Sequence, residues 1–229
     1  ARCADTQALR QLEYSNYLFN LHYRMDLSLE DERAAALAYD GIAKQTVFLH
    51  RHPDQADHKL RIGYISPDIR NHVVLRFSYA LFAGYDHARY EVWCYARSPE
   101  DGWSRRVMKL VDGWRNFTGM PDEAAARLIY EDGIDILFDL SGHTQGNCLP
   151  ILAYRPAPVQ LSGIGFMGTT GLAAVDYFLG DRYTDTAVLP AAALPEAGAA
   201  PEALDEVEVQ AARLRAISRA SAVLRALLH

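Results

Sequence analysis

Residues 59–66 read KLRIGYIS, an apolar run that ends in the turn-forming sequence Ser66-Pro67-Asp68. A short apolar run bounded by turn residues is typical of a strand that is buried on both faces. The stretch 134–142, IDILFDLSG, has the same near-continuous apolar character. Strands of this kind occur in parallel sheets that helices cover on both sides. These two stretches therefore decide the fold class.

Outward from these two strands, segments with helical patterns alternate with further strand-like segments. The predicted helices are 72–85, 102–113, 121–133 and a short one at 145–154, and the other predicted strands are 90–98, 114–119, 158–165 and 175–181. Such alternation indicates βαβ units. The sequence therefore predicts an α/β domain with a Rossmann-like, doubly wound parallel sheet over roughly 59–185.

The segments that flank this domain differ from it in composition. Residues 1–50 are predicted to form a helical linker segment, in which Ser28 caps the second helix. The polar stretch 50–58, HRHPDQADH, is predicted to be a solvated loop rather than a metal site. Residues 186–229 are rich in Ala and Pro and end in apolar residues three and four apart, which predicts a linker followed by an amphipathic C-terminal helix.

The bulk properties argue against several classes of protein. The net charge is −6, and the basic residues do not cluster, so we expect no nucleic-acid partner. No apolar run approaches the roughly 18 residues that a membrane span needs, and the first residues lack a signal-peptide pattern. We therefore expect a cytoplasmic protein. The three cysteines include no C-x-x-C pair, so neither a disulfide framework nor a zinc site is predicted.

Two histidines lie where an open α/β sheet binds ligands, which is beyond the carboxyl ends of the strands where the strand order reverses. In the Rossmann order, the loops after 59–66 and 134–142 face each other at that point. His72 lies in the first loop and His143 in the second. Imidazole is the side chain best suited to proton transfer near neutral pH, so both histidines are candidate catalytic residues.

Structural interpretations of the neighbouring polar residues are open as well. Asp68 and Asn71 are suitable caps for the helix that starts near His72. Asp139 is also consistent with a buried polar group whose hydrogen bonds are satisfied, and His143 with a single hydrogen bond to the backbone.

The stretch 163–168, GIGFMG, matches the glycine fingerprint G-x-G-x-x-G of dinucleotide-binding turns. The fingerprint belongs after the first strand of the sheet, whereas GIGFMG follows the fifth predicted strand. The next strand begins at Val175, too soon for a crossover of about ten residues, and Asp181 is too close to be the ribose-binding acid. We therefore predict no nicotinamide cofactor.

Four motifs occur in order along the chain. They are LRIGYISPDIRNH, DGIDILFDLSGHTQGN, RPAPVQ, and GTTG followed by DY. Together they resemble the catalytic region of the family 41 glycosyltransferases, the O-linked N-acetylglucosamine transferases and their Spindly-like relatives. The helical stretch YSNYLFNLHYR also resembles the segment that joins the family's tetratricopeptide repeats to that region. The resemblance covers about residues 7–185.

The resemblance implies the N-terminal lobe of a two-lobed GT-B fold, with the active site in the cleft between the lobes. It also implies inverting transfer of N-acetylglucosamine, or a related sugar, from a UDP-sugar to Ser or Thr of an acceptor protein, without a metal or other cofactor. In the family, the residues that match His72 and His143 lie near the reacting groups, so both are predicted to be catalytic. The predicted substrate-binding residues are Asp68, Asn71, Thr144, Ile164, Gly165, Gly168 and Thr169.

The chain departs from the family pattern at three places. Met167 stands where the family's sugar-pocket loop has proline, and Val74-Leu75-Arg76-Phe77 stands where many members have V-G-H-F. Nothing after Asp185 resembles the second lobe, which supplies most of the UDP contacts in the family. We therefore expect the transferase to be incomplete in this chain, through truncation or a shifted reading frame. The alternative is a non-catalytic protein- or sugar-binding module that retains only the N-terminal lobe.

Overall fold

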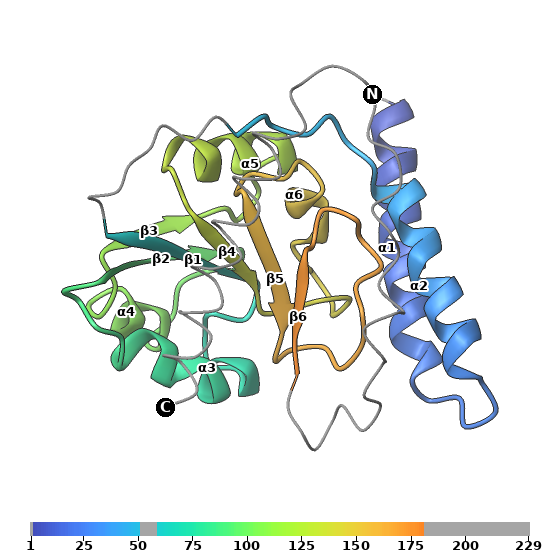
Figure 1. Cartoon of the computed structure of the whole chain (residues 1–229), viewed down its shortest axis with the longest axis horizontal. Helices are drawn as coiled ribbons and strands as arrows, with labels where there is room; N and C mark the ends of the chain where they lie inside the picture. The colour runs from blue at the N-terminus through green and yellow to red at the C-terminus, as the bar shows by residue number, and fades with distance from the viewer. Residues whose placement is uncertain (1, 51–58, 181–229) are drawn as a thin grey trace, which may run out of the picture. The chain divides into compact units, whose positions relative to one another are not determined.

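The computed structural model describes residues 2–50 and 59–180, which form a six-stranded parallel sheet with helices on both faces (Figure 1). The strands are β1 (Leu60–Ser66), β2 (Tyr90–Ala96), β3 (Gly113–Asn116), β4 (Ile136–Asp139), β5 (Val159–Gly163) and β6 (Tyr177–Leu179). Their order in the sheet is β3-β2-β1-β4-β5-β6, and every neighbouring pair is parallel. This order confirms the predicted Rossmann-like fold and places the reversal of strand order between β1 and β4.

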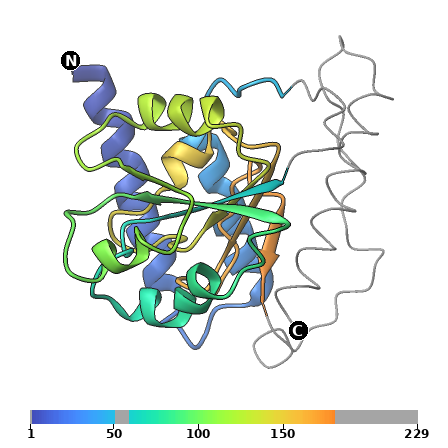
Figure 2. The same ribbon diagram turned by 90° about the vertical axis from the view of Figure 1, so that its left-hand side faces the viewer.

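The helices divide between the two faces of the sheet, as Figure 2 shows. They are α1 (Arg2–Leu21), α2 (Leu29–Ala43), α3 (Val73–Ala83), α4 (Ser104–Val107), α5 (Asp122–Glu131) and α6 (Leu149–Leu152). Successive side chains of β1 point to opposite faces of the sheet, so the strand packs against both layers of helices. On one face, Tyr64 contacts Phe82 of α3. On the other face, Ile65 belongs to a core that α1, α2, α5 and α6 share.

The N-terminal helices α1 and α2 lie side by side and pack against the sheet domain (Figure 1). Ser28 caps α2 as predicted, since its hydroxyl group accepts a hydrogen bond from the backbone N–H of Asp31 at 3.1 Å. Tyr39 and Ala43 of α2 are fully buried in the shared core. Residues 2–43 are therefore part of the packed domain, and they reach the site described below.

The helix predicted over 102–113 is much shorter than expected, because α4 is a single turn. The chain leaves the helix after Val107 and returns to the sheet, where the backbone N–H of Asp112 donates to the carbonyl oxygen of Val92 at 2.8 Å. Pairing with β2 therefore overrides the local helix propensity. The helix predicted at 145–154 likewise shrinks to α6, which tolerates Pro150 in its first turn.

Two sequence predictions concern residues outside the described part. Residues 186–229, the predicted linker and amphipathic helix, lie there, as do His52 and His58 of the predicted loop. Within residues 2–50 and 59–180, no helix is long and apolar enough to cross a membrane. The same residues contain no group of three or more His, Cys, Asp or Glu side chains arranged to hold a metal ion.

Candidate functional site

Three loops leave the carboxyl edge of the sheet, and the second of them lies against the other two. They follow β1 (67–72), β4 (140–148) and β5 (164–176), and we call them the switch-point loops. The first two are adjacent, because a Cβ atom added to Gly146 would lie 3.7 Å from Cβ of Pro67. The second and third are in tighter contact, since a Cβ atom added to Gly165 would lie 2.0 Å from the carbonyl oxygen of Leu140. The predicted site residues therefore belong to one continuous edge.

His72 ends the first switch-point loop and is the N-cap of α3. Its Nδ1 accepts a hydrogen bond from the backbone N–H of Val74 at 3.3 Å. The same nitrogen lies 3.6 Å from Oδ1 of Asp68, whose side chain is buried, whereas the His72 side chain is 37% exposed. His72 therefore combines partial exposure to the solvent with a buried carboxylate close to its ring.

The capping role that one interpretation gave to Asp68 or Asn71 belongs to His72 instead. Asp68 faces Arg70, with Oδ1 and Nη2 3.3 Å apart, as well as His72. The backbone N–H of Asn71 donates to Oδ2 of Asp101 at 2.7 Å, and Asn71 itself is exposed. Asp68 is thus placed to act on His72, while Asn71 presents its amide to the solvent side of the loop.

His143 has a different environment from His72, because it is only 1% exposed and both ring nitrogens have partners. Nε2 lies 2.9 Å from the carbonyl oxygen of Thr170, and Nδ1 lies 3.0 Å from Oγ of Ser15 in α1. A carbonyl oxygen only accepts, so Nε2 carries the hydrogen and Nδ1 accepts from the Ser15 hydroxyl group. Burial lowers the pKa of His143 to about 4, which keeps the ring neutral at pH 7.

These contacts go beyond the single backbone hydrogen bond that the structural interpretation offered for His143. The rings of Tyr39 and Phe166 also meet its imidazole edge-on, with centroids 4.7 and 5.3 Å away. A proton acceptor in catalysis needs a free lone pair that faces the substrate. His143 uses its only lone pair for Ser15, so its contacts favour a positioning role, and a catalytic role stays a prediction.

The depressed pKa of His143 makes stability depend on pH in a defined direction. An unfolded histidine takes up a proton near pH 6.5, whereas His143 in the folded chain does so only at about 4. Between these values the unfolded state binds more protons, so the folded state loses stability as the pH falls. We expect this residue alone to cost about 2–3 kcal/mol between pH 7 and pH 4.5.

Urea unfolding at pH 7 and at pH 4.5 measures this loss, with His143→Gln as the comparison. The variant should be less stable at pH 7, and its free energy of unfolding should change less between the two pH values than that of the parent. Equal pH dependence in both proteins would show that His143 is not a buried neutral histidine.

Asp139 at the end of β4 joins the second switch-point loop to strand β5. Its carboxylate accepts hydrogen bonds from the backbone N–H groups of Ser141 (3.1 Å) and Gly142 (2.7 Å) and from the hydroxyl group of Ser162 (2.8 Å). Burial raises the pKa of Asp139, and these donors oppose that rise. The interpretation of Asp139 as a satisfied buried group is confirmed.

The third switch-point loop begins with a strained turn at Ile164. Its φ is +69°, and the backbone N–H of Gly165 donates to the carbonyl oxygen of Gly163 at 2.8 Å, which closes a γ-turn. Positive φ at a β-branched residue is costly and is found mostly where the surrounding structure imposes it. Here the close packing of Gly165 on Leu140 imposes it. The residues between β5 and β6 contain no helix, so GIGFMG lacks the helix N-terminus that a dinucleotide pyrophosphate needs.

The remaining predicted binding residues lie along the same edge. Thr144 donates its hydroxyl hydrogen to the carbonyl oxygen of Ser141 at 2.9 Å. Thr169 is exposed, and its Oγ1 accepts from the backbone N–H of Gly171 at 3.2 Å. Gly168 lies under the ring of His22, because an added Cβ atom would be 2.8 Å from that ring. The structure thus brings Thr144, Gly168 and Thr169 to the loops that hold His72 and His143.

The sequence interpretation missed the contribution of α1 and α2 to this edge. Ser15 binds His143, the His22 ring packs on Phe166 with centroids 4.8 Å apart, and Asp40 accepts from the backbone N–H of Ala173 at 2.8 Å. A signal was present, because Gln11 and Ser15 are small or polar residues at helical spacing with Leu18 on the buried face of α1.

The fold and the site define a Rossmann-like domain with a polar edge where the strand order reverses, the place at which folds of this class bind ligands. The model of Glycosyl transferase family 41 matches residues 15–194, and the chain belongs to this family. The resemblance inferred from the sequence motifs is therefore confirmed, and the chain is a member of a glycosyltransferase family.

Relatives of known name agree with this assignment. A probable UDP-N-acetylglucosamine–peptide N-acetylglucosaminyltransferase SPINDLY of Oryza sativa subsp. japonica is 39% identical over 138 residues, which are 58% of this chain and 15% of that protein. The SEC protein of Arabidopsis thaliana with the same named activity is 37% identical over 127 residues, which are 55% of this chain and 13% of that protein. The chain therefore matches only a small part of these relatives.

A solved structure shows the same fold. A mutant O-GlcNAc transferase of Thermobaculum terrenum superposes with a TM-score of 0.70 and 33% identity, covering 75% of this chain and 34% of that protein. The α/β sheet found here thus corresponds to one part of a longer transferase.

Proposed function

We propose that this chain provides the N-terminal catalytic lobe of an inverting transferase that moves N-acetylglucosamine from UDP-N-acetylglucosamine to Ser or Thr of an acceptor protein. The choice of donor and acceptor is supported by the names of the relatives, which are UDP-N-acetylglucosamine–peptide N-acetylglucosaminyltransferases. The observation that carries the proposal is the half-exposed imidazole of His72 beside the buried carboxylate of Asp68, at the edge where this fold binds ligands. In this proposal the lobe spans 59–185.

In the proposed reaction, the acceptor hydroxyl oxygen attacks the anomeric carbon from the face opposite UDP. The new C–O bond forms as the bond to the UDP oxygen breaks, UDP leaves with the electron pair, and the configuration inverts. For this step the ring hydrogen of His72 lies on Nδ1 and faces Asp68, so Nδ1 gives up the hydrogen bond from Val74 and Nε2 is free to take the hydroxyl proton. Asp68 then stabilises the resulting imidazolium through Nδ1. No metal takes part in the proposed step.

The third switch-point loop shapes the sugar side of the proposed site. Ile164 and Gly165 hold the backbone close to the end of β4, and Gly168 lets the loop pass under His22. The hydroxyl group of Thr169 and that of Thr144 lie on the same edge and are the proposed hydrogen-bonding partners of the sugar. Asn71 is the proposed contact on the acceptor side.

A second candidate function is a non-catalytic module that binds protein or sugar. A departing UDP needs cationic partners for its diphosphate. On the described part of this edge, Arg70 pairs with Asp68 and Arg97 pairs with Asp122. Both guanidinium groups are thus already engaged by carboxylates, which favours a lobe whose diphosphate contacts come from elsewhere.

Radiolabelled UDP-N-acetylglucosamine and a Ser/Thr acceptor peptide separate the two candidates. The transferase predicts label in the peptide, and heat of binding when UDP is titrated in, once the 229-residue chain is combined with a separately supplied second lobe. No transfer and no UDP binding, together with measurable binding of the peptide or the free sugar, would leave the module as the function.

A further inference from the structure

The hydroxyl group of Ser15 connects two switch-point loops that are more than a hundred residues away in sequence. The side-chain amide of Asn147 donates to Ser15 Oγ at 3.3 Å, and Ser15 Oγ lies 3.0 Å from Nδ1 of His143. Nε2 of His143 then donates to the carbonyl oxygen of Thr170 at 2.9 Å. One serine of α1 therefore links the loop after β4 to the loop after β5.

The direction of every hydrogen bond in this series is fixed. Oδ1 of Asn147 accepts from the backbone N–H of Leu149 at 3.2 Å, so its NH₂ group faces Ser15. The Thr170 carbonyl oxygen can only accept, so the imidazole hydrogen lies on Nε2. Nδ1 of His143 must then accept from Ser15. Ser15 is only 1% exposed, so water has little access to replace it.

Other contacts of α1 and α2 hold the same segment, 164–173. His22 packs against Phe166, with its Nδ1 3.0 Å from Oε1 of Glu32. The backbone N–H of Ala173 donates to Asp40. Two points of the helical pair thus contact the loop after β5 directly, whereas Ser15 contacts the loop after β4 and reaches the loop after β5 through His143.

We propose that Ser15 is a positioning residue for the site: through the ring of His143, its hydroxyl group fixes segment 164–173 against the loop after β4. The proposal rests on the proposed function, because it takes segment 164–173 as the sugar side of the site. It gives α1 a direct part in shaping that site, although α1 contributes no residue to the proposed chemistry. Ser15 acts without touching the substrate.

Hydrogen exchange of the full chain, measured by mass spectrometry without substrate, tests the proposal. Ser15→Ala removes one donor and one acceptor, so amides in 164–173 should exchange about tenfold faster. Ser78→Ala is the matched control, because Ser78 is equally buried at 1% and its hydroxyl group bonds only within α3, to Val74 at 2.9 Å. The ring ¹⁵N signals of His143 should also lose the pattern of a single Nε2–H tautomer in Ser15→Ala alone.

Equal exchange of 164–173 in Ser15→Ala and in the parent would overturn the proposal, as would an equal rise in Ser78→Ala. If Ser15→Ala does not fold, Ser15→Cys keeps a side chain of similar shape with weaker hydrogen bonds and carries the same comparison. The exchange result does not depend on transfer activity. A failed transfer assay with an intact exchange effect would therefore count against the proposed function and leave the positioning role of Ser15 standing.

Discussion

His72→Ala should lower the rate of sugar transfer by about 10²–10⁴-fold, because general-base catalysis by a placed side chain contributes that much. The imidazole of His72 is half exposed beside the buried Asp68, whereas the ring of His143 is enclosed. The loss should appear in kcat, since the proton moves only in the transition state. Initial rates with labelled donor and acceptor peptide measure it.

His87→Ala is the matched control for this experiment. His87 is an exposed histidine between α3 and β2, at the amino edge of the sheet, and its ring contacts that of Tyr85 at a tilt of 47° with centroids 4.1 Å apart. Its removal should leave the rate within about twofold, because it is remote from the switch-point loops. Transfer that is equally fast in His72→Ala and His87→Ala would remove His72 from the mechanism.

Gly171→Ala should be the most destabilising of the single substitutions considered, with a loss of about 3 kcal/mol or more in the free energy of unfolding. The added Cβ atom would lie 1.8 Å from the carbonyl oxygen of Ala36, which is backbone of α2 and cannot move aside without shifting the helix. The φ of Gly171 is also +66°, in the left-handed region. Urea unfolding followed by circular dichroism measures the loss.

Two further glycines separate the steric effect from the backbone effect. Gly119 has a φ of +74° and open space around it, so Gly119→Ala should cost only about 1 kcal/mol. Gly41 lies within α2 and also has open space, so Gly41→Ala should gain about 0.5–1 kcal/mol. A loss for Gly171→Ala no larger than that for Gly119→Ala would contradict the close packing of the third switch-point loop on α2.

The sheet could be predicted from the sequence because its strands are short apolar runs between helical patterns. Residues 59–66 and 134–142 became β1 and β4, and their paired place in the sheet follows from topology rules that hold for most α/β domains. The prediction failed at α4, where pairing of Asp112 with β2 ends the helix early. That pairing is a tertiary contact, and local propensity contains no information about it.

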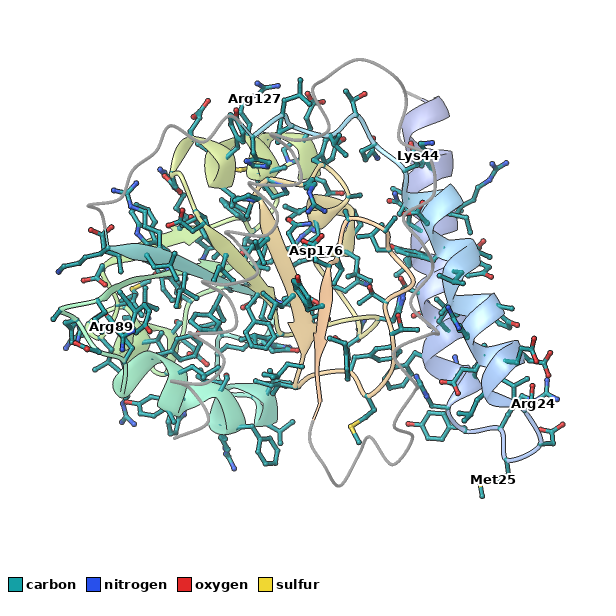
Figure 3. The ribbon with its side chains drawn as sticks, in the orientation of Figure 1. Arg24, Met25, Lys44, Arg89, Arg127 and Asp176 are labelled. Carbon is teal, nitrogen blue, oxygen red and sulfur yellow. The ribbon has the colours of Figure 1, made fainter. Side chains whose placement is uncertain are left out.

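Parts of the family motifs proved to be structural. Arg155 of RPAPVQ donates to the carboxylate of Asp176 at 2.7 Å and to the carbonyl oxygen of Ala174 at 3.1 Å, and Asp176 is labelled beside β6 in Figure 3. Gln160 also donates to the carbonyl oxygen of Ala174, at 2.7 Å. The RPAPVQ and DY motifs therefore stabilise the packing of β5 against β6, next to the loop with the proposed sugar contacts.

The roles of the two histidines could not be told apart from the sequence. Both follow a strand at the predicted site, and both match a family motif. Only the packing of α1 shows that Ser15 takes the lone pair of His143, while His72 faces a buried carboxylate and the solvent. The contact between Ser15 and His143 spans 128 residues, a separation over which periodicity and spacing give no signal.

Mapping of UDP-N-acetylglucosamine on the chain by NMR chemical-shift perturbation tests the central claim most directly. Millimolar donor should shift backbone amides in 66–72, 141–144 and 164–171, the loops at the carboxyl edge. It should leave unchanged the amides of Arg89 and Gly133, at the amino edge of the sheet. Shifts confined to the amino edge, or no shifts within the switch-point loops at saturating donor, would contradict a sugar site where β1, β4 and β5 end.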